Sequence, residues 1–268
     1  RDVYPLTGSQ KGIFAECSKN PESTVYNIPF LFELENTVDV QKLSEAVTAM
    51  VNAHSYLLTE VYLSDKGEMV QRPCEDTFIP EVIETTNAQF ETLKNELVRP
   101  FKLEKGRLFR ARIYCTEDKK YLFTDFHHII ADGNSYDIIF EDINRAYKGE
   151  KLEKESYTGL DAALDEEQQM KEGKYKKAEK YYDSVFGEVE TESLPLPDCA
   201  GKVPEKGYLE RKLNIKEDTI LSSCEKFGVT PNVLFTGLFG ILMAKYSNSE
   251  DSLFATIYNG RNDSRLEN

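Results

Sequence analysis

The sequence has no tryptophan, only three histidines and five cysteines among its 268 residues. The cysteines, at positions 17, 74, 115, 199 and 224, form neither a Cys-x-x-Cys pair nor a Cys/His cluster. This odd and scattered set argues against a disulfide framework and against a metal site, and it suits a reducing cytoplasm. Long apolar runs are also absent, so we expect no membrane-spanning segment and no membrane partner.

Basic residues are fewer than acidic ones. The sequence has 33 Lys and Arg residues and 47 Asp and Glu residues, which gives a formal net charge of −14. This balance argues against a nucleic-acid partner. Hydrophobic residues at 40% and aromatic residues at 11% suffice for a sizeable core in one large domain or two modest ones. The chain starts at Arg1 without a leader-like pattern, so we expect it to be a piece of a longer polypeptide.

Two of the three histidines are adjacent, in residues 127–133, which read His-His-Ile-Ile-Ala-Asp-Gly. With ordinary residue frequencies this fixed pattern arises by chance in fewer than about one such chain in a thousand. Histidine is the side chain best suited to proton transfer near neutral pH. The motif therefore predicts a reaction centre, with His128, His127, Asp132 and Gly133 as its candidate catalytic residues.

The residues before the motif, 120–126, are aromatic and partly β-branched, which favours a strand. Neighbouring side chains on a strand point to opposite faces. If the strand continues to the pair, His127 and His128 do not share one pocket. We expect one of them to be held against the body of the protein and the other to be the working imidazole.

Apolar residues after the motif recur every three or four positions, which predicts a helix over residues 135–147 with Ser135 as its N-cap and an end near Gly149. The motif then lies at a strand–loop–helix junction. We expect Asp132 to hold the loop by accepting hydrogen bonds. Gly133 is expected to give unusual backbone angles or close approach of a ligand.

The rest of the chain predicts a mixed order of strands and helices. Strands are predicted at residues 25–34, 57–63, 108–114, 208–213 and 253–258. Helices are predicted at residues 40–51 with Asp39 as cap, at 88–98, at 218–227, and from Thr230 onward. The last helix is apolar enough that we expect it to be buried, whereas the charged run 166–180 predicts a solvated helix face. This order indicates an α+β, sandwich-like fold.

Residues 127–133 resemble the His-His-x-x-x-Asp-Gly signature of the condensation domains of nonribosomal peptide synthetases, within the chloramphenicol-acetyltransferase-like acyltransferases. Other stretches resemble further motifs of that family in the right order. They are residues 4–14 (Pro-Leu-Ser/Thr-x-x-Gln), 51–59 (Arg-His-x-x-Leu-Arg-Thr), 100–103 (Pro-Phe-x-Leu) and 259–261 (a Gly-Arg element). The resemblance covers essentially the whole chain.

The second of these motifs lacks both arginines, since Ala53 and Leu58 stand in their places. In the family, the arginine that matches Leu58 is thought to pair with the motif aspartate. A buried carboxylate needs compensation. The resemblance therefore implies that Asp132 uses another cation, Arg110 or Arg112, or relies on hydrogen bonds.

The resemblance implies a chloramphenicol-acetyltransferase-like αβ sandwich of two similar lobes that meet in a V, with the histidine motif at their junction. On this pattern, residues 1–190 are a complete N-terminal lobe, residues 191–207 are a linker rich in proline and glycine, and residues 208–268 begin a truncated second lobe. Half a lobe exposes apolar surface. We therefore expect the isolated fragment to be poorly stable and inactive.

The resemblance also implies peptide-bond formation between an acyl or peptidyl thioester donor and an aminoacyl thioester acceptor. Both substrates are carried on the phosphopantetheine of upstream and downstream peptidyl carrier proteins, next to adenylation domains, and this domain has no cofactor or metal of its own. His128 sits beside the acceptor amine, as general base or as a group that positions it. His127 is structural, Asp132 braces the loop, and Gly133 gives the substrate room.

Two alternatives remain open at this point. Epimerisation domains and free-standing acyltransferases carry the same histidine motif, so the site is compatible with a different reaction. The other alternative is a catalytically silent module that docks carrier proteins, which the missing arginines at Ala53 and Leu58 favour and the intact histidine pair opposes.

Overall fold

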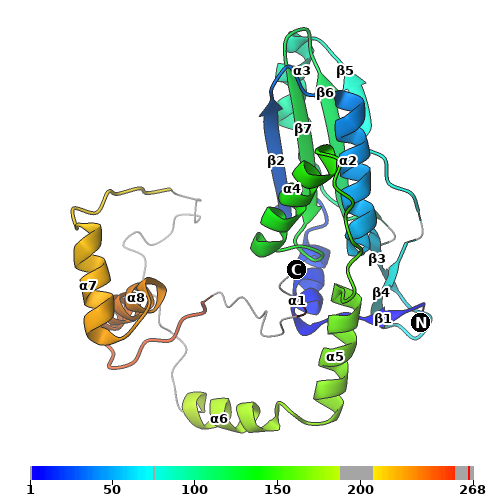
Figure 1. Cartoon of the computed structure of the whole chain (residues 1–268). Helices are drawn as coiled ribbons and strands as arrows, with labels where there is room; N and C mark the ends of the chain where they lie inside the picture. The colour runs from blue at the N-terminus through cyan, green and yellow to red at the C-terminus, as the bar shows by residue number, and fades with distance from the viewer. Residues whose placement is uncertain (1, 75, 105, 188–207, 257–264, 266–268) are drawn as a thin grey trace. The chain divides into compact units, whose positions relative to one another are not determined.

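The computed structural model of the chain describes residues 2–74, 76–104, 106–187, 208–256 and 265. The chain divides into two compact units. The first consists of Arg1–Tyr175 with Arg261–Asn268, and the second of Lys176–Gly260. Figure 1 labels the helices and strands of both units.

The first unit is built on a four-stranded sheet in the order β2-β7-β6-β5. Strands β2 (Asn27–Leu34), β7 (Lys120–His127) and β6 (Phe109–Cys115) pair antiparallel, and β5 (Glu81–Glu84) runs parallel to β6. Strand β7 lies between two neighbours, and seven of its eight residues are buried. A strand covered on both faces can be apolar throughout, which explains its aromatic sequence.

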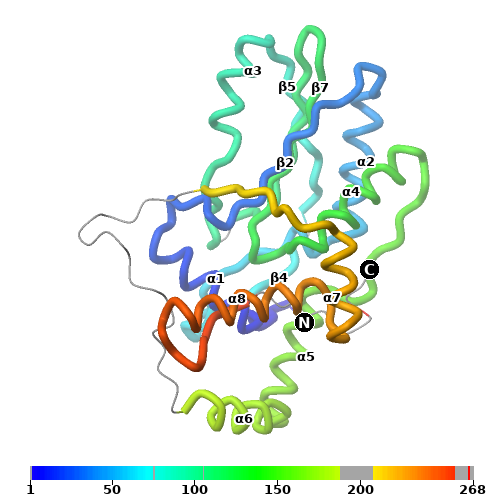
Figure 2. Tube along the Cα trace, turned by 90° about the vertical axis from the view of Figure 1, so that its left-hand side faces the viewer, coloured from blue at the N-terminus to red at the C-terminus, as the bar shows by residue number. Residues whose placement is uncertain are grey.

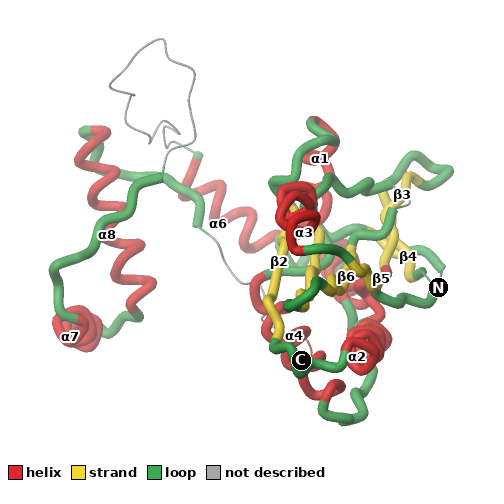
Figure 3. Tube along the Cα trace, turned by 90° about the horizontal axis from the view of Figure 1, so that it is seen from above, coloured by secondary structure: helices red, strands yellow, loops and turns green. Residues whose placement is uncertain are grey.

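Helices cover both faces of this sheet. Helix α2 (Val40–Ala53) and helix α4 (Gly133–Tyr147) pack together against the face that carries Leu122 and Phe126. Helix α3 (Asn87–Leu93) and the short η2 (Lys94–Glu96) cover the other face, where Phe90 stacks on Tyr121. Figures 2 and 3 show α3 on the opposite side of the sheet from α2 and α4.

A second, three-stranded sheet in the order β1-β4-β3 joins the N-terminal segment to this core. It contains β1 (Tyr4–Pro5), β4 (Met69–Pro73) and β3 (Thr59–Leu63), and the short η1 (Ser55–Leu58) precedes β3. Helix α1 (Gly8–Lys19) follows β1, and helix α5 (Gly159–Lys171) contacts β1. Gly159 is required there, because a Cβ at this position would lie 2.4 Å from the ring of Tyr56.

The second unit contains α6 (Lys176–Phe186), α7 (Glu217–Phe227) and α8 (Pro231–Ser247). Helix α7 ends at Gly228 in the left-handed conformation, and Thr230 caps α8, as the sequence predicts. The predicted burial of α8 is wrong, because Met243 is its only buried residue among those described. Apolar side chains of α8 and of residues 254–255 instead line an open groove.

Two strands predicted in the second unit are not found in its described residues. Residues 208–213 and 253–256 are described without strand structure, whereas 257 and 258 lie outside the described residues. Both segments have strand-like composition, but a strand needs a hydrogen-bonding partner, and the described part of this unit provides no sheet. The predicted boundary at residue 190, the linker at 191–207 and the Gly-Arg element at 259–261 lie outside the described residues.

The α+β class is confirmed in the first unit, together with the strands predicted around 25–34, 57–63 and 108–114 and the helix capped by Asp39. The predicted helix at 88–98 is shorter, because it ends as α3 at Leu93 and continues as η2. The charged run 166–180 lies on α5 and α6 and is mostly exposed, as expected of a solvated face.

Candidate functional site

The histidine motif lies at the end of a buried strand, as the sequence predicts. Strand β7 ends at His127, residues 128–130 form a turn, and α4 begins at Gly133. The predicted cap is wrong by three positions, because Asp132 is the N-cap and Ser135 is the third residue of the helix. Asp132 accepts from the Ser135 backbone N–H at 3.1 Å, and the Ser135 hydroxyl accepts from the Asp132 N–H at 3.2 Å. An ionised carboxylate is the stronger acceptor at the positive end of a helix.

His127 points into the protein and is 4% exposed. Its Nδ1 accepts the backbone N–H of Ile129 at 3.1 Å, so its ring proton belongs on Nε2, which lies 3.6 Å from the sulfur of Cys17. Burial, followed by the neighbouring His128, lowers the pKa of His127 to about 4, and burial also raises the pKa of the Cys17 thiol. Both groups are therefore neutral at pH 7, and the contact is an N–H···S hydrogen bond rather than an ion pair.

His128 has the opposite environment, because its side chain is exposed. Its backbone N–H donates to the Tyr26 carbonyl at 2.9 Å, and its ring lies edge-on to that tyrosine with 6.4 Å between ring centroids. The two imidazoles differ as predicted, with one held in the body of the protein and the other facing outward, but the predicted reason does not hold, because β7 ends at His127 and His128 lies in the turn. His128 is the one that a substrate can reach.

Asp132 braces the loop through hydrogen bonds, since its carboxylate also accepts the Ser135 hydroxyl at 2.9 Å. The two arginines considered as its partners are engaged elsewhere. Arg110 lies 3.2 Å from Asp125, and Arg112 lies 3.0 Å from Glu81. The suggestion that either arginine pairs with Asp132 is therefore wrong.

Gly133 is exposed and is the first residue of α4. Its φ is not positive, so its predicted use of unusual backbone angles is wrong. A Cβ placed on it would meet nothing within 4 Å. The space above Gly133 is open, which fits the prediction that a ligand approaches closely there.

A buried polar group two residues before the motif is not predicted by the sequence pattern. Asp125 is fully buried in β7, where it accepts from the Asn27 amide at 2.8 Å and pairs with Arg110, whose guanidinium lies 3.9 Å from the centroid of the Phe101 ring. Burial raises the pKa of Asp125 to about 6, against the opposing effects of Asn27 and Arg110. A lone carboxylate inside an aromatic strand is the signal that identifies it.

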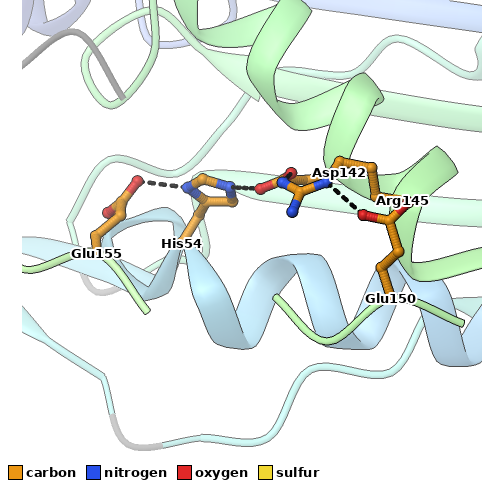
Figure 4. Close-up of polar contacts among 5 residues, drawn as sticks. All are labelled: His54, Asp142, Arg145, Glu150 and Glu155. Carbon is orange, nitrogen blue, oxygen red and sulfur yellow. Dashed lines mark hydrogen bonds and ion pairs between the residues drawn. The ribbon is translucent and has the colours of Figure 1, made fainter. Parts of the chain in front are cut away.

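The third histidine, His54, is also part of a charged cluster (Figure 4). It is 8% exposed at the C-terminal end of α2, and its Nδ1 and Nε2 atoms lie 2.5 Å from Glu155 and 2.9 Å from Asp142. Arg145 then bridges Asp142 at 2.7 Å and Glu150 at 2.9 Å. Because both ring nitrogens face carboxylates, His54 is a charged imidazolium that ties α2 to α4 and to the loop after α4.

Among the described residues, no group of three or more His, Cys, Asp or Glu side chains is arranged to hold a metal ion. The four cysteines in the described ranges, Cys17, Cys74, Cys115 and Cys224, are free. No single described helix has the length and apolarity to cross a membrane, and α7 with α8 meets that criterion only as a pair bent by 87°.

The chain belongs to the condensation domain family, whose model matches residues 1–268. It is 31% identical to tyrocidine synthase 2 of Brevibacillus parabrevis over 96% of the chain, and 26% identical to gramicidin S synthase 2 of Brevibacillus brevis over 100% of the chain. It spans only 7% and 6% of the lengths of these relatives.

Solved condensation domains share the fold. The condensation domain of the monacolin K polyketide synthase MokA matches with a TM-score of 0.73 and 17% identity, covering 93% of this chain and 61% of that one. The first condensation domain of the CDA synthetase matches with a TM-score of 0.64 and 15% identity, covering 92% and 63%. The predicted chloramphenicol-acetyltransferase-like α+β fold is confirmed by these likenesses.

Proposed function

We propose that the polypeptide to which this chain belongs forms an amide bond between a thioester-bound acyl or peptidyl donor and an aminoacyl thioester acceptor. The observation that carries the proposal is the exposed imidazole of His128, held at the end of a buried strand in a chain that belongs to the condensation domain family. Both relatives described above are synthases by name, which fits this reaction class.

The chemistry needs one proton transfer at the acceptor amine. The amine nitrogen attacks the thioester carbonyl, a C–N bond forms, the C–S bond breaks, and the amine proton ends on the leaving thiolate. His128 lies beside the amine as the general base or as the group that positions it, and general-base help of this kind contributes about two to four orders of magnitude in rate. His127 stays neutral and structural, because it is buried with both ring nitrogens engaged.

Asp132 and Gly133 shape the entrance to this imidazole. Asp132 caps α4 and so fixes where the helix begins, and the open space over Gly133 lets a thioester arm pass close to the backbone. The first backbone N–H groups of a helix are donors suited to a developing oxyanion. In this scheme the domain binds no cofactor or metal of its own.

The proposed partners are two peptidyl carrier proteins that bring their substrates on phosphopantetheine, and adjoining synthetase domains such as adenylation domains. The relatives are many times longer than this chain, which fits a multidomain context. Because the chain carries a net charge of −14, docking of acidic carriers relies on local basic spots and apolar contacts. A cytoplasmic location stays a prediction.

The replaced arginines support a second candidate, a silent module that binds carriers without catalysis. Ala53 and Leu58 are buried in the core of the first unit, so the positions that carry arginine in the family are apolar here. In this second candidate function the domain still binds the carrier proteins but catalyses no reaction.

The test uses the complete natural polypeptide with both carriers loaded, followed by mass spectrometry of the carrier-bound species. A dipeptidyl thioester supports condensation. An aminoacyl thioester that gains deuterium at its α-carbon, with no dipeptide, indicates epimerisation instead. Carrier binding without either product leaves only the silent module.

A further inference from the structure

A buried polar network connects the N-terminal helix to the turn that carries His128. It is formed by Gln10 on α1, Gln71 on β4 and the phenol of Tyr56, and the two glutamines are 6% and 0% exposed. The Gln10 amide nitrogen donates to the Ile129 carbonyl at 3.1 Å. We infer that Gln10 is a positioning residue for His128, an inference that rests on the proposed function.

The orientation of the Gln10 amide is fixed by obligate partners. Its Oε1 accepts the backbone N–H of Thr7 at 3.0 Å, which only an oxygen can do, and its Nε2 donates to the Ile129 carbonyl, which only a nitrogen can do. Gln71 supports it, since Gln71 Nε2 donates to the Pro5 carbonyl at 2.8 Å and to Gln10 Oε1 at 3.1 Å. A fully satisfied buried network of this kind holds one arrangement.

The contact matters because Ile129 directly follows His128. The backbone N–H of Ile129 donates to His127 Nδ1, and the Ile129 carbonyl accepts from Gln10. The N–H of His128 itself is held by the Tyr26 carbonyl. The backbone on both sides of His128 is therefore fixed, although its side chain is exposed, and Gln10 supplies a side-chain anchor from outside the motif, beside the backbone anchor at Tyr26.

Gln10 also completes the N-terminal capping box of α1, so an ordinary loss of helix stability must be separated from a loss of positioning. Helix α3 provides the matched control. Gln89 forms the same capping box with Thr86, through bonds of 3.1 Å and 3.2 Å, and it is exposed. A substitution at Gln89 removes the side-chain half of the capping box without touching the histidine turn.

Two variants separate the roles at Gln10 itself. Gln10→Glu keeps the acceptor for the Thr7 N–H, since glutamate is a normal capping-box residue, but its carboxylate cannot donate to Ile129. Gln10→Met removes both functions without adding a charge, which covers the case in which the glutamate variant does not fold.

The experiment measures hydrogen exchange by mass spectrometry in peptides that span residues 126–131, and steady-state kinetics of dipeptide formation, in the complete natural polypeptide. For Gln10→Glu and Gln10→Met we expect exchange in this peptide to rise on the order of tenfold. We expect kcat to fall about ten- to a hundredfold at unchanged KM, since the loop moves but no substrate contact is removed. Gln89→Met should leave both measurements within about twofold of the parent.

Unchanged exchange in residues 126–131 of the folded Gln10 variants would overturn the inference. So would faster exchange with an unchanged kcat, if His128→Ala is inactive in the same assay. Full activity of His128→Ala would be a different failure. It would contradict the proposed function, and Gln10 would then have no catalytic group to position. The exchange measurement remains readable in either case, so the two failures are distinguishable.

Discussion

The Nδ1 atom of His127 accepts the backbone N–H of Ile129, 3.1 Å away and two residues further along the chain. This bond places the ring proton on Nε2, toward Cys17, and makes His127 part of the wall behind the turn. The first histidine of the motif thereby fixes the backbone from which the second is presented. The two imidazoles have different environments, because His127 is buried and His128 is exposed.

This arrangement predicts a specific dependence of stability on pH. The pKa of His127 falls from 6.5 in the unfolded chain to about 4 in the folded one, so the unfolded state binds more protons between these values. Stability is full above about pH 6.5 and is lost as the pH falls toward 4, by up to about 3 kcal/mol. His127→Asn, which keeps an acceptor for Ile129, should remove this loss in urea unfolding of the 268-residue chain followed by circular dichroism.

Asp125 changes the stability in the opposite direction over part of the same pH range. Its pKa rises from 3.8 to about 6 on folding, so its contribution is full below pH 3.8 and lost as the pH rises through 6. Asp125→Asn should therefore steepen the acid loss that His127 causes, whereas His127→Asn should flatten it. If the two substitutions shift the pH profile in the same direction, the assignment of these pKa values is wrong.

His54 predicts a third pH dependence of stability, which appears as the pH rises above 6.5. Burial by itself lowers the pKa of His54, but the hydrogen bonds that His54 donates to Glu155 and Asp142 outweigh it and the net pKa is raised above 6.5. Its stabilising effect is full below pH 6.5 and is lost as the pH rises through the folded pKa. His54→Ala should cost about 3 kcal/mol near pH 6, since it leaves Glu155 without its cation and Asp142 with Arg145 alone, and the cost should shrink at higher pH. A cost that does not change with pH would show that His54 is neutral in the folded chain.

The two glycines near the site should respond differently to alanine. Gly133→Ala should leave the unfolding midpoint unchanged or slightly higher, because its Cβ meets nothing and alanine favours a helix. Gly159→Ala should destabilise the chain by about 1–3 kcal/mol, because its Cβ would overlap the Tyr56 ring. If Gly133→Ala nevertheless lowers dipeptide formation, the open space above it is used by substrate; unchanged kinetics would remove that role.

Asp132 and Asp39 cap two helices in the same way, and only the first belongs to the motif. Each accepts a backbone N–H three residues further on, at 3.1 Å in α4 and 3.0 Å in α2. Alanine at either position should cost about 1 kcal/mol of stability. Asp132→Ala should also reduce dipeptide formation, whereas Asp39→Ala should not; equal kinetic effects would reduce Asp132 to an ordinary cap.

The first unit was predictable from sequence because its signals are local. The aromatic and β-branched composition of β7, the three-and-four spacing of α2 and the motif at a strand–helix junction each depend on residues close together in the chain. The different exposure of His127 and His128 was predicted from strand geometry, although His128 lies in the turn that follows the strand. The capping error at Ser135 arose because two good cap residues compete there, and sequence alone does not rank their geometry.

The missed features depend on contacts between distant residues. Asn27 and Asp125 meet through the pairing of β2 with β7, and His54 meets Glu155 across a separation of 101 residues. The predicted burial of α8 was wrong for a related reason, because the burial of a helix depends on what packs against it. Its apolar composition is compatible with a core, but the described part of its unit does not cover it.

The proposed role of His128 is tested most directly by comparing the parent polypeptide with His128→Ala in single-turnover formation of the dipeptidyl thioester. Both carriers are loaded, and carrier binding is measured in parallel. We expect the variant to bind both carriers and to form product at least about a hundredfold more slowly, because the proposed mechanism has the exposed imidazole act on the amine. Product formed at the parental rate by His128→Ala would contradict it and return the motif to a structural role.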